Sequence, residues 1–104
     1  MKFRVIQSHK AKNDLVRLTD VLLERAQTAE DLDRALLALE TLQGSIAALA
    51  DSALRCRKAG GGSDPFLREL VIPFDSSGYM ALFGIVGDAV VVAAVRRELE
   101  DDYQ

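Results

Sequence analysis

The chain has 104 residues, of which 49% are hydrophobic and 28% are charged, and this suits one globular domain with a single modest core. Its net charge of −3 argues against a protein whose main task is to bind phosphate backbones, because such proteins carry an excess of Lys and Arg. The single cysteine, Cys56, allows no internal disulfide, and no apolar run reaches the ~18 uncharged residues that span a bilayer, so we expect a cytoplasmic protein that does not enter membranes.

The chain begins with a predicted strand and a predicted amphipathic helix. Lys2–Gln7 alternates in the manner of a short strand. Ser8 then offers an N-cap oxygen for a helix that continues to about Ala26. Apolar residues recur every three or four positions along this helix, and Asp14 is assigned to its polar side with the other charged residues. We therefore expect this helix to lie on an apolar surface.

A second, longer helix is predicted to follow. Thr28 and Asp31 have the spacing of a capping box, which places the helix start near Ala29. Apolar residues then hold an alternating three-and-four step, which predicts a helix to about Lys58 that packs antiparallel against the first helix. Gly44 interrupts the pattern, and it predicts either a close helix contact or a slight bend.

The second half of the chain predicts a three-stranded antiparallel meander. Ala59–Pro65 contains three consecutive glycines and is predicted to be a flexible link. Three apolar runs follow, separated by an Asp-Ser-Ser-Gly turn signal and a Gly-Asp turn signal. These predicted strands are Phe66–Phe74, Tyr79–Val86 and Ala89–Val95. Both faces of this sheet are partly apolar, so either helices cover one face and a partner the other, or the chain self-associates.

The predicted fold class is α+β, in the order β-α-α-β-β-β. It comprises a short N-terminal strand, a long antiparallel helical hairpin, the three-stranded meander and a short C-terminal tail, Arg96–Gln104. The whole chain, residues 1–104, forms one domain in this interpretation.

This layout resembles the RelE/ParE superfamily of toxins from type II toxin-antitoxin systems. The stretch FLRELVIPFDSSGYMALFGIVGDAVVVAAVRRELEDDY is similar to the usual ending of that family: an arginine entering a strand, a turn followed by Gly-Tyr, a valine-rich strand, then basic residues and a tyrosine. The N-terminal half matches by element order alone. The resemblance implies a toxin that a cognate antitoxin neutralises in a hetero-oligomeric complex.

The family divides by mechanism, and the resemblance allows the chemistry to be checked. RelE-like members cut messenger RNA on the ribosome, with lysines on the strand before the turn, an arginine after Gly-Tyr, and an arginine and a tyrosine near the C-terminus. The first three of these positions hold Val71, Pro73 and Met80 here, and only Arg97 and Tyr103 match. Removing several groups that stabilise a transition state lowers the rate severely.

We therefore expect a non-enzymatic, ParE-like toxin that inhibits DNA gyrase by binding. This preference comes from elimination and from the length of the hairpin, since no motif identifies gyrase. The first alternative is a RelE-type, ribosome-dependent endoribonuclease that uses Arg68, Arg97 and Tyr103. The second alternative is a helical-hairpin interaction module that self-associates through its sheet.

The candidate site residues are few, and each also has a purely structural interpretation. Arg68 is a candidate for target or antitoxin contact, or it forms a surface salt bridge. Arg96 and Arg97 are candidates for the same contact, or they pair with carboxylates of the tail. Tyr79 and Tyr103 either bind the partner or pack. The sequence predicts no cofactor, because the glycine run has neither the lysine nor the setting of a nucleotide site. It also predicts no metal, because it contains no cluster of metal-ligating residues.

Overall fold

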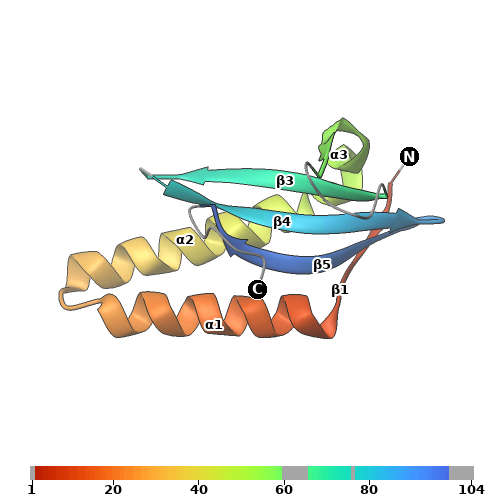
Figure 1. Ribbon diagram of the computed structural model, residues 1–104. Coiled ribbons are helices and arrows are strands. Elements are labelled where there is room, and N and C mark those ends of the chain that lie inside the picture. The colour runs from red at the N-terminus through yellow and green to blue at the C-terminus, as the bar shows by residue number, and fades with distance from the viewer. Residues whose placement is uncertain (1, 60–65, 76, 99–104) are drawn as a thin grey trace.

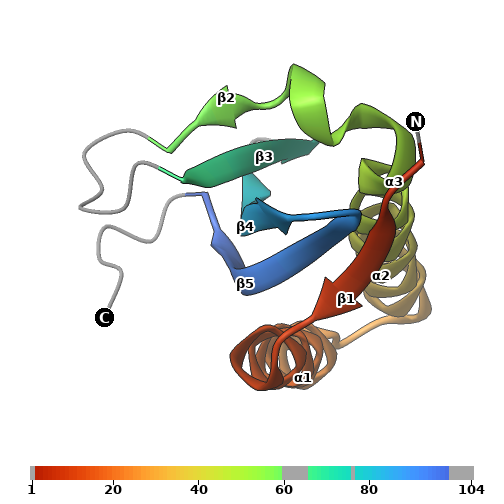
Figure 2. The ribbon, with the colours of Figure 1, turned by 90° about the vertical axis from the view of Figure 1, so that its right-hand side faces the viewer.

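The computed structural model describes residues 2–59, 66–75 and 77–98, and these form a mixed sheet with two long helices packed on one of its faces (Figures 1 and 2). Within this described part, the sheet has five strands in the order β1-β5-β4-β3-β2. β1 runs parallel to β5, and the other neighbours are antiparallel. The elements are β1 (Arg4–Gln7), α1 (His9–Arg25), α2 (Ala29–Ala47), α3 (Leu49–Ser52), a 3-10 turn η1 (Ala53–Arg55), β2 (Arg57–Lys58), β3 (Leu67–Phe74), β4 (Ser77–Val86) and β5 (Ala89–Arg97).

The predicted helical hairpin is confirmed, and both of its N-caps form as expected. The Ser8 hydroxyl accepts a hydrogen bond from the Ala11 amide at 3.0 Å. The Thr28 hydroxyl accepts one from the Asp31 amide at 3.0 Å, and the Asp31 carboxylate accepts one from the Gln27 amide. These bonds satisfy amides that a helix start leaves without intrahelical partners. The strand, hairpin and meander thus follow the predicted α+β order.

The second helix ends earlier than predicted, at Ala47 and not near Lys58. The chain then turns through α3 and η1 and adds Arg57–Lys58 as a short strand beside β3. Leu49 and Ala53 remain fully buried through this turn, so the apolar spacing continues although the helix does not. A Cβ at Gly44 would meet nothing within 4 Å, and the predicted close helix contact there is wrong.

The core lies between the helices and one face of the sheet. Phe83, Val92 and Val95 point from the sheet toward Leu18 and Leu42, and each is at most 2% exposed. β5 extends through Arg97, so Arg96 and Arg97 belong to the strand and do not follow it. Residues 60–65 of the predicted flexible link and the tail beyond Glu98, Tyr103 included, lie outside the described residues. No helix in the described ranges is long and apolar enough to cross a membrane.

Candidate functional site

The strand register decides which side chains share each face of the sheet. In β3, Leu70 and Ile72 lie beneath the helices, so Glu69 and Val71 lie on the opposite, open face. A row of directly paired residues crosses this open face from β3 to β5. Val71 pairs with Met80, and Met80 pairs with Arg96. Pro73, paired with Gly78, lies beside this row.

The open face therefore carries Val71, Pro73 and Met80, the three positions at which RelE-like members have cations. Met80 is only 8% exposed, and its sulfur lies 3.6 Å from Nη2 of Arg96. Glu69 is also 8% exposed, and its carboxylate accepts from Nε of Arg57 at 2.7 Å. In the described part of this face, Arg96 thus lies beside the apolar side chain of Met80, and the carboxylate of Glu69 is paired with Arg57 of β2.

The structure divides the predicted site residues among separate places. Arg97 faces the helices and lies directly opposite Tyr79, whereas its neighbour Arg96 faces the open side. Arg68 also lies on the helix side of the sheet, where its Nη1 donates to the carbonyl oxygen of Cys56 at 2.7 Å. This hydrogen bond attaches Arg68 to the residue just before β2, an arrangement that the sequence did not indicate. Tyr103 is outside the described residues.

Tyr79 and Arg97 line one end of a cavity of about 150 Å³ between α1 and the sheet. The ring of Phe74 packs against that of Tyr79, with 6.5 Å between centroids. Burial raises the pKa of the Tyr79 hydroxyl, and the nearby Arg97 opposes this shift. The hydroxyl is therefore a neutral hydrogen-bond donor at physiological pH.

No group of three or more His, Cys, Asp or Glu residues that could hold a metal ion occurs among the described residues. Cys56 is partly buried, and this burial raises the pKa of its thiol, although Arg68 acts in the opposite direction. A raised pKa disfavours the thiolate, which is the nucleophilic form. Cys56 is thus a packing residue.

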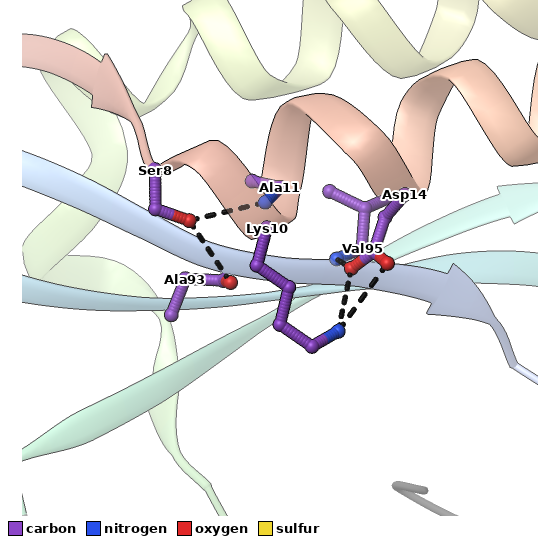
Figure 3. Close-up of polar contacts among 6 residues, drawn as sticks. All are labelled: Ser8, Lys10, Ala11, Asp14, Ala93 and Val95. Carbon is purple, nitrogen blue, oxygen red and sulfur yellow. Dashed lines mark hydrogen bonds and ion pairs between the residues drawn. The ribbon is translucent and has the colours of Figure 1, made fainter.

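The side chains of Ser8, the N-cap of α1, and of Asp14 within α1 fix the end of β5 that carries both arginines (Figure 3). β1 pairs with β5 only as far as Val92, so the next backbone groups of β5 need other partners. The Ser8 hydroxyl donates to the Ala93 carbonyl at 3.1 Å, and Asp14 Oδ2 accepts from the Val95 amide at 3.0 Å. The pairing also shifts register in this part of β5, at the Leu82/Phe83 step of β4.

Asp14 was assigned to the polar side of its helix, and the structure corrects this. Asp14 is 9% exposed. Nζ of Lys10 lies 3.0 Å from Oδ2 of Asp14, the same oxygen that accepts from the Val95 amide. Asp14 is three residues after Ala11 and four before Leu18, both of which are buried. This spacing places Asp14 on the buried face of the helix, and it was the signal in the sequence for that burial.

Replacing Asp14 with alanine is expected to lower the free energy of unfolding by about 2 kcal/mol, because the buried amide of Val95 loses a charged acceptor. Asp20→Ala, on the same helix but exposed, should change it by less than about 0.5 kcal/mol. Urea unfolding of both variants measures the difference. Equal stability of the two variants would contradict a structural role for the Asp14 bond.

The helical hairpin on one face of an antiparallel meander, with the other face open, defines the layout of a RelE/ParE-type toxin. The chain is similar to two proteins of Caulobacter vibrioides: Toxin RelE3, at 34% identity over 88% of this chain and 89% of that protein, and Toxin RelE1, at 32% identity over 96% and 98%. The chain belongs to the RelE/ParE superfamily of toxins from toxin-antitoxin systems. No family model matches it.

The fold is also that of a solved toxin-antitoxin structure. The chain aligns with a structure described as the chromosomal ParDE toxin-antitoxin system from P. aeruginosa, with a TM-score of 0.70 over 92% of this chain and 96% of that chain. Sequence identity there is 17%, so this similarity concerns the fold alone. Membership of the family implies an antitoxin as partner.

Proposed function

We propose that this toxin acts in the cytoplasm by binding DNA gyrase, and that it does not cleave RNA. The observation that supports this is the row Val71, Met80 and Arg96 on the open face, with Pro73 beside it. RNA cleavage needs positive charge at the phosphorane-like transition state, and losing one such donor typically costs about a hundredfold or more in rate. Binding to gyrase requires no set of catalytic cations, so a surface without them is compatible with this function. Inhibition of purified gyrase tests the proposal.

The second candidate is ribosome-dependent cleavage of messenger RNA, and the names of the two Caulobacter relatives favour it. The sequence suggested Arg68, Arg97 and Tyr103 for this role, and the register adds Arg96 as a cation on the open face. Cleavage predicts that Arg96→Ala or Arg97→Ala abolishes growth arrest, with new 5′ ends inside translated messages. Growth arrest without such ends would contradict this candidate.

Exposed apolar side chains on the hairpin support a protein partner for that surface. Leu32, Leu36 and Leu37 of α2 are 43%, 50% and 52% exposed, and Val16 and Leu23 of α1 are 60% and 44% exposed. Leu32 and Leu36 are four residues apart and so lie on one face of α2. Apolar side chains grouped in this way mark an interaction surface more often than isolated ones do. We assign this surface to the antitoxin, whose neutralising segment would order on contact. The competing occupant of this hairpin surface is a second copy of this chain, whereas the self-association alternative from the sequence placed that contact on the sheet.

Leu36→Glu is expected to weaken antitoxin binding by about 10- to 100-fold, because a charge would replace an apolar contact at the interface. Leucine and glutamate have similar helix propensities, so the hairpin should remain folded. Leu54→Glu, at a site 64% exposed on η1, is the matched control and should bind as wild type. Calorimetric titration measures both affinities.

Two results would contradict the assignment of the hairpin to the antitoxin. One is equal affinity of the Leu36 and Leu54 variants for the antitoxin. The other is a wild-type dimer at low micromolar concentration that Leu36→Glu converts to a monomer, because that outcome assigns the surface to self-association.

A further inference from the structure

The cavity beside Tyr79 has an apolar floor and a charged rim. It lies between the second half of α1 and the end of the sheet where β3 turns into β4. Leu18, Val21, Leu22 and Phe74 supply its apolar lining, and Arg25, Asp75, Tyr79 and Arg97 supply its polar groups. An apolar pocket with a few convergent polar groups is the usual form of a binding site.

The charges at this rim do not compensate one another. Asp75 forms an ion pair with Arg34 of α2, so its charge already has a partner. Within residues 2–59, 66–75 and 77–98, neither Arg25 nor Arg97 forms an ion pair with a carboxylate. Arg97 is nevertheless half-buried, and a partly desolvated guanidinium is stabilised by an anionic partner. The cavity thus offers two cations and the neutral hydroxyl of Tyr79.

The site continues along the hairpin as a groove. A second cavity, of about 210 Å³, shares Leu22, Arg25, Phe74 and Asp75 with the first and extends to Ala35 of α2. A lone anion would fill only one end of this groove, whereas a peptide segment would fill both. The groove is lined by three cations, Arg25, Arg34 and Arg97, and by two carboxylates, Asp31 and Asp75. This small excess of positive charge suits one carboxylate better than a polyanion such as RNA.

We propose that this groove binds an acidic peptide segment of the antitoxin. One Asp or Glu side chain of that segment accepts hydrogen bonds from Arg97, Arg25 and the Tyr79 hydroxyl, and a neighbouring apolar side chain packs on Leu22 and Phe74. Planar guanidinium groups suit carboxylates because they donate two parallel bonds. This inference rests on the pairing with an antitoxin and is independent of the gyrase proposal.

The test is the affinity of the full-length toxin for the purified product of the neighbouring gene, taken as the antitoxin. Arg97→Gln is expected to weaken binding by about 10- to 100-fold, because it leaves the antitoxin carboxylate without its main partner. Arg25→Gln should weaken it less, and the double variant should show a shallower salt dependence than wild type. Arg55→Gln, an exposed arginine of η1 outside the groove, is the matched control and should bind within twofold of wild type. Thermal unfolding confirms that each variant is folded.

A carboxylate scan of the antitoxin then identifies the bound residue. One Asp→Asn or Glu→Gln change should weaken binding to wild-type toxin and cause no further loss with Arg97→Gln. Affinities of Arg97→Gln and of the double variant within twofold of Arg55→Gln would overturn this site while leaving the pairing with the antitoxin intact. Failure of wild-type toxin to bind at all would overturn that pairing, and this site with it.

Discussion

Phe83→Ala is expected to lower the free energy of unfolding by about 3 to 5 kcal/mol, the largest effect of any substitution considered. The Phe83 side chain is fully buried in the layer between β4 and the helices. Its removal would lose the transfer free energy of the ring and leave a cavity that neighbouring strands cannot close. Since small domains are stable by only about 5 to 15 kcal/mol, this variant should retain little stability.

Phe66→Ala is the matched control, because Phe66 is 80% exposed just before β3. It should change the stability by less than about 0.5 kcal/mol. Urea unfolding measures both variants, and an unchanged slope would show that the denatured state is the same. Equal losses in the two variants would contradict the placement of Phe83 in the core.

Gly78→Ala is expected to cost about 3 kcal/mol, near the upper end for overpacking. A Cβ at Gly78 would overlap the carbonyl oxygen of Ile72 and also approach Cα of Pro73. Both are backbone atoms of the paired strand β3, so a side-chain rotation cannot relieve the contact. Because Gly78 precedes Tyr79 and Met80, the same strain would also disturb both faces of the site.

Gly44→Ala provides a control of opposite sign. Nothing lies within 4 Å of a Cβ at Gly44, which is in α2, so alanine should raise the stability by up to ~1 kcal/mol through helix propensity. Differential scanning calorimetry of the two glycine variants compares them directly. A stable Gly78→Ala protein would show that β3 and β4 approach less closely than the structure indicates.

The fold was largely predictable because its local signals agree with its packing. The Ser8 and Thr28 caps begin helices as predicted, and the Gly-Asp turn joins β4 to β5. The end of α2 was not predictable from periodicity, because Leu49 and Ala53 keep the apolar spacing after Ala47. Apolar periodicity reports burial, and burial does not require a continuous helix. A two-residue strand of charged residues, such as β2, has no hydrophobic pattern to detect.

The sequence offered candidate residues for the site but not their arrangement. Arg96 and Arg97 were predicted to lie in the tail after the last strand, so the sequence did not assign them to faces of the sheet. The facing pair Tyr79 and Arg97 depends on the register between two strands. Asp14 was missed because a charged residue near a buried helix face is usually exposed. The explanation lies in β5, because β1 pairs with β5 only as far as Val92. The amide of Val95 therefore needs another acceptor, and the buried carboxylate of Asp14 supplies it.

The most direct test of binding without catalysis is gyrase supercoiling of a relaxed plasmid in the presence of purified toxin, with double-strand breaks recorded in parallel. We predict inhibition accompanied by trapped breaks, and restored supercoiling when the antitoxin is added first. A parallel translation reaction should show no cuts in the messenger. Full supercoiling in the presence of folded toxin that arrests growth in cells would contradict the gyrase proposal, and cuts within the translated message would establish the ribonuclease in its place.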